Sequence, residues 1–557
     1  MAPKANAINV TLNSNAFAEA SAFGSNTPYG LDENKIAQKV YFGKNGTNSQ
    51  GWYIAGHQAS GYGEDEEEGA LVLLCDPNQP MVSSQVFIEQ GDYKNDFYYG
   101  YINKTLYQDD ETYTEATQVY AHHYGASAIK RKLGDLEKDT NIFTTSEQNL
   151  MKATKTYTYD LKNNKTYNIA SKLYLAAGTL SETYITVGAN EVDTNKTGNA
   201  RVNNGLKVGL TSATGPSQSP YTVGNILFWL RSPDVSDTRK ALQAKTGNSI
   251  TSDIVYPNSS TLGDTPLIPA LALDSSSVLF ASIAEPNTNV ATVSDGMYLR
   301  FKDTNSRITT QATVSRDGIN VTKGSENPVY LYIQGNNNGT DWAYSKNIAA
   351  ANETITIQDI NAACGLNLES LKNCKAWLET TENNLTYAKT FDVSEVELAT
   401  PIHIALKDEF GNEVTNISGI TLTLKDNSGT IVTSNNDWEQ TDKIFKSKNL
   451  YSGNYQLTVT VNENNSSYMS PAGTFTITKI NGISPSSATE PNQTVVLQQK
   501  IIDFNHVLTS MGGEASCKYN RQTKKKTFKI TPNPGYKLDK IWEGADGKVS
   551  YVRFKIV

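Results

Sequence analysis

Residues 228–237 read FWLRSPDVSD and set one arginine, Arg231, between a bulky apolar run and a Ser-Pro turn. A charge in such a setting must be paired to be tolerated. A guanidinium carries five donors in a planar fork, so it can satisfy several backbone carbonyls, or a carboxylate, at once. We therefore interpret Arg231 as a structural residue, together with Trp229 in the same block, and keep ligand binding as the alternative for Arg231.

The composition indicates a multidomain, mainly β protein. The chain has 557 residues, too many for one hydrophobic core, and only 19 % of them are charged while Tyr alone counts 30. Thr and Tyr suit pleated strands, and Asn and Gly supply the turns between them. The net charge of −8 opposes nucleic-acid binding, which needs a basic face. We interpret the lysine run at 524–526 as a solvated strand edge.

Features of the chain predict a secreted or wall-attached protein. No apolar run approaches the roughly 18 to 20 residues that span a bilayer, and the N-terminus shows no hydrophobic signal core. We expect a piece of a longer secreted protein, without membrane insertion in this part. Cysteine is rare, as is typical of Gram-positive surface proteins. Cys364 and Cys374 are close enough in sequence to bridge or could be two buried thiols, whereas Cys75 and Cys517 are expected to be free.

The texture of the sequence changes along the chain. The first half is irregular and aromatic-rich, with two short amphipathic or capped helices expected near 126–136 and 145–151. After residue 286, strands and turns recur about every 8 to 12 residues, which is typical of sandwich modules. The predicted regions are an N-terminal segment at 1–29, an α+β domain at 30–290, a β-sandwich module at 291–397 with a helical insert at 357–363, an Ig-like β-sandwich at 398–480, and a small β module at 481–557 that could be truncated.

No catalytic signature stands out. The chain has no phosphate-binding loop, dinucleotide fingerprint, zinc-protease helix or nucleophile elbow. His122 and His123 are adjacent, but neighbouring side chains diverge, so a shared metal is awkward. The acidic run at 64–68 could collect calcium, although a solvated hairpin tip is favoured. The Glu-Pro-Asn tripeptides at 285–287 and 490–492 resemble a sugar-binding motif of mannose-binding C-type lectins, but both are interpreted as linkers. We predict no cofactor, with calcium as the one ion considered.

A tyrosine-rich stretch is the predicted ligand-binding site. Residues 90–120 combine tyrosines with Asp and Asn, and amphipathic rings beside carboxamides suit sugar stacking or protein contact. An aromatic core with solvated hydroxyls is an equal alternative. The candidate binding residues are Asp96, Tyr98, Tyr99, Tyr101 and Tyr107.

Residues 30–285 resemble an uncharacterised domain of Firmicute surface proteins, related to the C-type-lectin-like fold of formylglycine-generating enzymes. The motifs that carry the resemblance are VYFG at 40–43, YGAS at 124–127, FTTSEQ at 143–148, FWLRSP at 228–233 and IPALALD at 268–274. The resemblance implies a structural role for Pro269. Family members commonly have an arginine where this chain has Ile268, which puts any two-arginine site in doubt. Residues 341–346 and 377–381 also resemble the β module that often follows this domain in gut Clostridia.

Together these patterns predict a C-type-lectin-like head followed by all-β Ig-like sandwich modules, arranged as a rod. The predicted function is a non-enzymatic adhesin on the surface of a Gram-positive bacterium, which binds a host glycan or glycoprotein through its head. The alternative is a structural subunit of a pilus or surface layer. Formylglycine-generating enzymes bind copper through a cysteine pair, and the lectin-like region has only Cys75, so an enzyme of that kind is the poorest reading.

Overall fold

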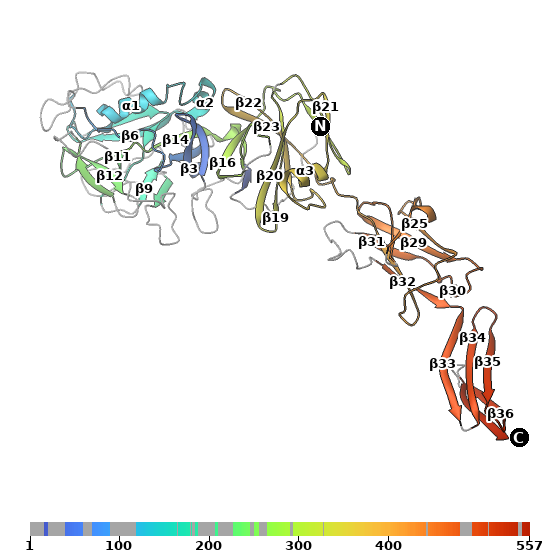
Figure 1. The fold of residues 1–557 in the computed structure, drawn as a ribbon. Coiled ribbons are helices and arrows are strands. Elements are labelled where there is room, and N and C mark those ends of the chain that lie inside the picture. Colours follow the sequence, from blue (N-terminus) through green and yellow to red (C-terminus); the bar gives the residue numbers. More distant parts are fainter. Residues whose placement is uncertain are drawn as a thin grey trace. The chain divides into compact units, whose positions relative to one another are not determined.

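The chain is mainly β and multidomain. The computed structural model describes residues 16–19, 39–58, 70–89, 118–163, 165–178, 180, 184–187, 206–209, 227–245, 250–255, 265–289, 293–326, 328–441, 444–479, 493–510, 512–543 and 549–557. These residues split into two compact units (Figure 1). The first unit comprises 1–366 with 371–395, and the second comprises 367–370 with 396–557. Each unit is described by itself.

A large sheet organises the first unit. Among the described strands, thirteen belong to it, and the main path runs β20-β19-β22-β23-β16-β2-β3-β4-β14-β5. The strands of this sheet are β1 Phe17–Glu19, β2 Lys39–Asn45, β3 Asn48–Gln58, β4 Ala70–Cys75, β5 Met151–Lys152, β8 Tyr174–Leu175, β14 Pro269–Asp274, β15 Val278–Ala284, β16 Val293–Lys302, β19 Tyr330–Asn337, β20 Thr340–Asn347, β22 Lys375–Glu382 and β23 Leu385–Phe391.

Smaller sheets and helices complete the first unit. These elements are β6 Thr154–Asp160 with β7 Lys165–Ser171, β9 Tyr184–Val187 with β10 Leu206–Gly209, β11 Leu227–Pro233 with β12 Lys240–Lys245 and β13 Ile250–Ile254, β17 Gln311–Ser315 with β18 Gly318–Thr322 and β21 Asn352–Ile355, and the helices α1 Ala128–Leu136, α2 Thr145–Leu150 and α3 Ile357–Cys364. The helices predicted near 126–136, 145–151 and 357–363 are therefore confirmed.

Local sequence explains why these elements form. All six residues of β4 are buried, so its unbroken apolar run is covered on both faces of the sheet. The α2 helix begins with a capping box, in which Thr144 and Glu147 satisfy each other's backbone N–H groups. In α3 the same arrangement joins Thr356 to Asp359, and Gly365 ends the helix in the left-handed conformation.

Strand β16 holds the large sheet together. One edge of it pairs with β15, and the other edge pairs in parallel first with β2, at Met297 and Tyr298, and then with β23, at Phe301 and Lys302; Figure 1 shows it between β3 and β23. The sheet is therefore continuous across residue 290, where a domain boundary is predicted. Residues on both sides of it belong to the same compact unit, and the boundary itself stays a prediction.

A buried ion pair lies on this junction. Arg300 donates from Nε to Glu379 Oε2 at 3.0 Å, and from Nη2 to the carbonyl of Ala284 at 2.7 Å. The Trp377 indole donates to the same carboxylate oxygen at 2.6 Å and stacks on Tyr332, with ring centroids 5.3 Å apart. Arg300 thus plays the role that the sequence suggested for Arg231: one planar fork that satisfies a carboxylate and backbone carbonyls together.

Two facing sheets and a second small module form the second unit. The first sheet of the sandwich contains β24 His403–Asp408, β27 Glu439–Thr441, β28 Ile444–Lys446, β30 Tyr468–Met469 and β32 Gln493–Gln499. The second sheet contains β25 Ile420–Lys425, β26 Ile431–Thr433, β29 Gly453–Val461 and β31 Phe475–Lys479. The small module has a sheet of β33 Ile501–Ser510, β34 Gly513–Asn520 and β35 Lys525–Pro532, and a strand pair of β36 Tyr536–Glu543 and β37 Val549–Ile556. Strands β24, β25 and β29 alternate buried with exposed side chains, as expected for sheets covered on one face.

The two modules of the second unit meet without a linker at residue 500. Strand β32 pairs in parallel with β24 and ends at Gln499, and β33 begins at Ile501. Lys500 lies between them, and its ammonium group donates to the carbonyl of Glu463 at 2.8 Å. Arg521 reaches back to Glu409 at 2.6 Å. The start of the last module at residue 481 stays a prediction, and β32 belongs to the sheet of the preceding sandwich.

Candidate functional site

The residues predicted to bind a ligand lie outside the described residues. This holds for Asp96, Tyr98, Tyr99, Tyr101 and Tyr107, and for the acidic run at 64–68. Their roles stay predictions.

The predicted structural residues lie in the core of the first unit. Arg231 is 1 % exposed, and it donates from Nη1 to the carbonyl of Leu175 at 2.6 Å. Trp229 packs edge-on against Phe87 at 5.3 Å between ring centroids. Pro269 opens β14 directly opposite Leu175 in β8. The FWLRSP and IPALALD blocks therefore both contact β8, which gives a physical reason why the two motifs occur together in one chain.

A cleft forms where β2, α2, β16 and the β22–β23 hairpin come together. Its volume is about 180 Å³, and its wall includes Tyr41, Tyr298, Asn287 and Asn384. Clefts that enclose drug-sized ligands usually measure about 300–1,000 Å³. This cleft therefore suits one small ring or the end of a longer chain.

Two tyrosine rings form the aromatic part of the cleft. Alternation along β2 buries Val40 and Phe42 and leaves Tyr41 half-exposed on the other face. Parallel pairing of β2 with β16 sets Tyr298 directly beside Tyr41, and the rings stack with centroids 4.8 Å apart at an interplanar angle of 29°. Each ring covers one face of the other, and the pair contributes two phenol hydroxyl groups to this part of the cleft.

Two glycines make room for this arrangement. A Cβ added to Gly296 in β16 would lie 2.8 Å from Tyr41 Cε2, and one added to Gly51 in β3 would lie 2.8 Å from Lys39 Cε. Atoms do not approach so closely without displacement of the neighbouring side chain. Any larger residue at either position would therefore move Lys39 or Tyr41.

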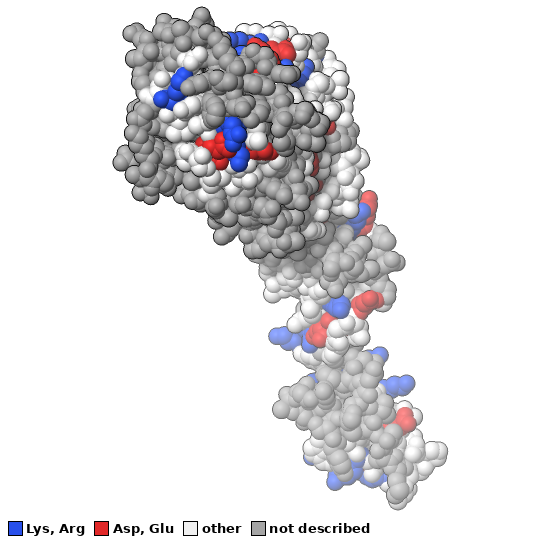
Figure 2. All heavy atoms as spheres, turned by 90° about the vertical axis from the view of Figure 1, so that its left-hand side faces the viewer, with Lys and Arg blue, Asp and Glu red and all other residues white. Residues whose placement is uncertain are grey.

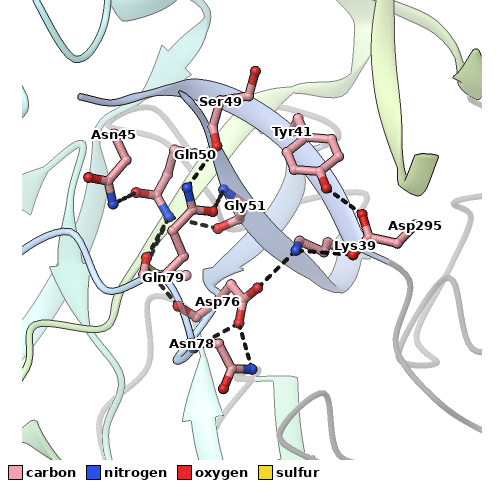
Figure 3. A network of polar contacts seen from close by, with 11 residues as sticks. Lys39, Tyr41, Asn45, Ser49, Gln50, Gly51, Asp76, Asn78, Gln79 and Asp295 are labelled. Atoms are coloured by element: carbon pink, nitrogen blue, oxygen red, sulfur yellow. Dashed lines mark hydrogen bonds and ion pairs between the residues drawn. The ribbon is translucent and has the colours of Figure 1, made fainter. Parts of the chain in front are cut away.

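Charged groups surround the Tyr41 hydroxyl (Figure 3). It donates to Asp295 Oδ1 at 2.6 Å, and the Lys39 ammonium group lies 3.6 Å from Asp295 Oδ2 and 3.2 Å from Asp76 Oδ2. The hydrogen bond from Tyr41, helped by the charge of Lys39, lowers the pKa of Asp295. Burial lowers the pKa of Lys39, but Asp76 and Asp295 more than offset this, so the pKa is raised. Lys39 is therefore charged and Asp295 ionised at neutral pH.

Burial, and then the hydrogen bond to Asp295, raise the pKa of Tyr41 well above its usual value. Burial also raises the pKa of Tyr298. These phenols stay protonated, so the cleft offers hydroxyl groups rather than a phenolate base.

Carboxamides behind Lys39 have a structural role. Gln50 donates to the carbonyls of Gly51 at 2.9 Å and Gln79 at 2.8 Å, and Gln79 donates to the carbonyl of Ser49 at 2.9 Å (Figure 3). Asp76 accepts from the backbone N–H of Asn78 at 2.9 Å. These bonds fix the chain that follows β4 against β3. Because the amides of Gln50 and Gln79 are engaged with the backbone, the polar groups considered for a ligand are those that line the cleft.

The opposite wall joins α2 to the β22–β23 hairpin. The two-residue turn of this hairpin, Asn383 and Asn384, has positive φ values of 50° and 62°. Thr144 Oγ1 lies 2.7 Å from the carbonyl oxygen of Asn383. Burial raises the pKa of Glu147, against hydrogen bonds from Thr144 and Asn384.

His122 and His123 are buried rather than arranged as a metal site. His122 Nδ1 lies 3.2 Å from the carbonyl oxygen of Asp237 and 3.1 Å from that of Lys240. Burial, and then the neighbouring His123, lower the pKa of His122 to about 4. In the part of the chain that the structure describes, no group of three His, Cys, Asp or Glu could hold a metal ion, and no helix is long and apolar enough to cross a bilayer.

Sequence reasoning missed this cleft, although it quoted some of its residues. Tyr41 was read as part of the VYFG motif, and Pro286 and Asn287 as a linker, yet all three line the cleft. Tyr298 and Asp295 carried no signal, because they come next to Tyr41 only through the parallel pairing of β2 with β16.

No protein-family model matches the chain, and no curated protein matches it. Among solved structures it is similar to the T6 backbone pilin of serotype M6 Streptococcus pyogenes, which has a modular three-domain structure decorated with variable loops and extensions. The match has 10 % sequence identity and a TM-score of 0.18, and it covers 43 % of this chain and 65 % of the pilin chain, less than two thirds of the pilin's length.

Proposed function

We propose that this chain is a non-enzymatic bacterial surface adhesin that binds the terminal sugar of a glycan in the Tyr41 cleft. The observation that carries the proposal is the stacked pair of Tyr41 and Tyr298 beside the ionised Asp295. The apolar face of a sugar ring stacks on aromatic rings, and its hydroxyl groups bond to carboxylates and amides. Asn287 and Asn384 supply amides in the same cleft.

The size of the cleft, and the ionised state of Asp295 beside it, favour binding over acid catalysis by Asp295. A volume of about 180 Å³ suits one ring of a glycan rather than a chain enclosed along its length. Asp295 has a lowered pKa and already accepts a proton-bearing partner, so it is a poor general acid at neutral pH. In the wider proposal, residues 30–290 form a C-type-lectin-like head, and the protein is secreted or attached to the cell wall.

The experiment is a glycan array with the full chain, followed by titration of the best ligand into variants. Tyr298→Ala should weaken binding by about tenfold, since it removes one stacking ring. Tyr41→Phe keeps the ring, loses the bond to Asp295, and should weaken binding less while leaving the fold intact. The matched control is Tyr330→Ala, a half-buried tyrosine on β19 outside the cleft. Unchanged binding by Tyr298→Ala and Tyr41→Phe would reject the cleft as the glycan site.

A second function, a structural subunit of a surface assembly, is supported by the junction at residue 500. One strand passes directly into the next module, and the Arg521–Glu409 ion pair braces the joint. A rigid joint suits a protein that bears tension between neighbours. Sedimentation across a range of concentrations separates the two: an assembly subunit self-associates, whereas an adhesin stays monomeric and gives saturable glycan binding.

A further inference from the structure

The Tyr41 cleft lies where strand β16 changes its partner. One edge of β16 pairs with β2 as far as Tyr298, and the same edge pairs with β23 from Phe301 onward. Neither register gives Leu299 or Arg300 a partner residue on this edge. The cleft therefore opens beside a two-residue interruption in the described part of the large sheet, and Leu299 forms part of its wall.

Four nearly buried apolar side chains line the cleft. Phe42, Leu299, Phe301 and Leu385 are each at most 5 % exposed, and all four belong to the hydrophobic core of the first unit. We call this set the apolar floor. A ligand that reaches it must bring an apolar group, because a polar group placed against it would lose its bonds to water. A methyl group meets this requirement.

Two threonine hydroxyl groups belong to the same wall. Pairing of β22 with β23 sets Thr381 opposite Thr386, and their Oγ1 atoms lie 3.0 Å apart. Both residues line the cleft, and Thr386 is only 5 % exposed. Each hydroxyl group has one proton to donate, and the bond between the two groups uses only one of these protons. Within the described residues no other acceptor takes the second proton, so the pair can donate it to a carbonyl group of a ligand.

The Asn384 side chain supplies an acceptor beside this donor. Its amide nitrogen donates to the Glu147 carboxylate, which fixes the amide on the side of α2. An amide also carries a carbonyl oxygen with two lone pairs, and this oxygen can accept from an N–H group of a ligand. The cleft wall thus combines one donor, one acceptor and the apolar floor.

The charges around the cleft are balanced. The described residues with charged side chains in its wall are Lys44 and Glu147, and the Glu147 carboxylate accepts from the Thr144 backbone N–H at 2.7 Å. Close to the tyrosine pair, Lys39 and Asp295 form an ion pair at 3.6 Å. Figure 2 shows a similar mixture on one face of the molecule, where blue and red atoms of described residues lie side by side. A neutral ligand is therefore favoured over an acidic one.

We propose that the Tyr41 cleft selects an N-acetylated amino sugar. The acetamido group has a carbonyl that accepts from the Thr381–Thr386 pair, an N–H that donates to Asn384, and a methyl group that packs on the apolar floor. A 6-deoxy sugar also brings a methyl group, but it leaves the donor and the acceptor of the wall without partners, which costs affinity. This inference rests on the function proposed for the cleft and adds the group that is recognised.

The test is calorimetric titration of the full chain with three methyl glycosides that differ only at C2: those of N-acetylglucosamine, glucosamine and glucose. The same three derivatives of galactose cover the other configuration at C4. In at least one of the two series, the N-acetylated sugar should bind about tenfold or more tightly than both of its counterparts. Methyl fucoside, a 6-deoxy sugar, should bind at least about tenfold more weakly than that N-acetylated sugar.

Two variants locate the selectivity. Thr386→Val removes the hydroxyl group with little change of shape, and should lower the preference for the N-acetylated sugar by about fivefold or more while glucose or galactose binds as before. Asn384→Gly should have a similar effect, and glycine tolerates the left-handed backbone there, φ 62°. The matched control is Asn338→Gly in the β19–β20 turn, φ 52°, outside the cleft, and it should keep the full preference. Thermal unfolding confirms that all three variants are folded.

The outcomes separate this inference from the proposed function. Equal affinity for the N-acetylated sugar and its hydroxyl counterpart overturns the selectivity and leaves glycan binding in place. Tighter binding of methyl fucoside also overturns it and assigns the apolar floor to a deoxy sugar. Absence of binding to every sugar, on the array and in titration, rejects the proposed function and this inference together. An unchanged preference in both Thr386→Val and Asn384→Gly, or an equal loss in Asn338→Gly, rejects this wall as the acetamido site.

Discussion

Arg300 and Glu379 lie 79 residues apart in the sequence, yet their side chains meet at 3.0 Å with neither exposed to solvent. They join β16 to β22 through the interior of the first unit. Glu379→Gln would leave a buried guanidinium without a compensating charge and should destabilise the unit by about 3–5 kcal/mol. Calorimetric unfolding of the full chain measures the loss.

The control for this prediction is the partly exposed pair of Arg307 and Glu382, at 2.7 Å, where Glu382 is 57 % exposed. Glu382→Gln should cost less than about 1 kcal/mol. Similar losses of unfolding free energy for the two variants would show that burial does not determine how much the Arg300–Glu379 pair contributes to stability.

Arg231→Ala should unfold the part of the first unit around β8 and β11. The change strands the carbonyl of Leu175 and empties a buried volume, at a cost of at least about 2 kcal/mol. Arg239→Ala is the comparison, since its side chain is 41 % exposed and pairs locally with Asp237. A folded Arg231→Ala protein with impaired ligand binding would mean that FWLRSPDVSD is functional rather than structural.

Gly296→Ala should weaken glycan binding without unfolding the protein. The new Cβ would lie 2.8 Å from Tyr41 Cε2, so the ring must move and its stacking on Tyr298 changes. We expect a loss of about tenfold in affinity and only a small change in melting temperature. Val293→Ala, at an exposed position on the same strand, should leave both unchanged. A normal affinity for Gly296→Ala would show that Tyr41 is not part of the binding surface.

His122 should make the first unit less stable in mild acid. Its pKa is lowered to about 4 in the folded chain and is about 6.5 when unfolded, so the unfolded chain takes up a proton first. The contribution is fully present above pH 6.5 and falls by up to roughly 3 kcal/mol as the pH drops to about 4. Denaturant unfolding across this range, compared with His122→Gln, measures it. A pH profile that His122→Gln leaves unchanged would assign the acid sensitivity to other groups.

The local patterns of the sequence predicted individual elements well. Unbroken apolarity in β4, alternation in β24, β25 and β29, and the capped start of α2 are visible in the sequence, because each depends on neighbours within a few residues. The buried position of the FWLRSP block is likewise predicted by its local run of apolar residues.

The candidate site depended on contacts that no local pattern contains. Clustered tyrosines at 98–107 drew attention because they are close in sequence, whereas Tyr41 and Asp295 are 254 residues apart. Parallel pairing of β2 with β16, and the docking of the β22–β23 turn on Thr144, bring the walls of the cleft together. The sequence by itself therefore determined which segments are strands and helices and which of their faces are buried, because side-chain periodicity records burial directly. Only the tertiary structure decided which strands lie side by side, because strand order is set by burial and hydrogen bonding summed over the whole sheet, and no single segment carries that information.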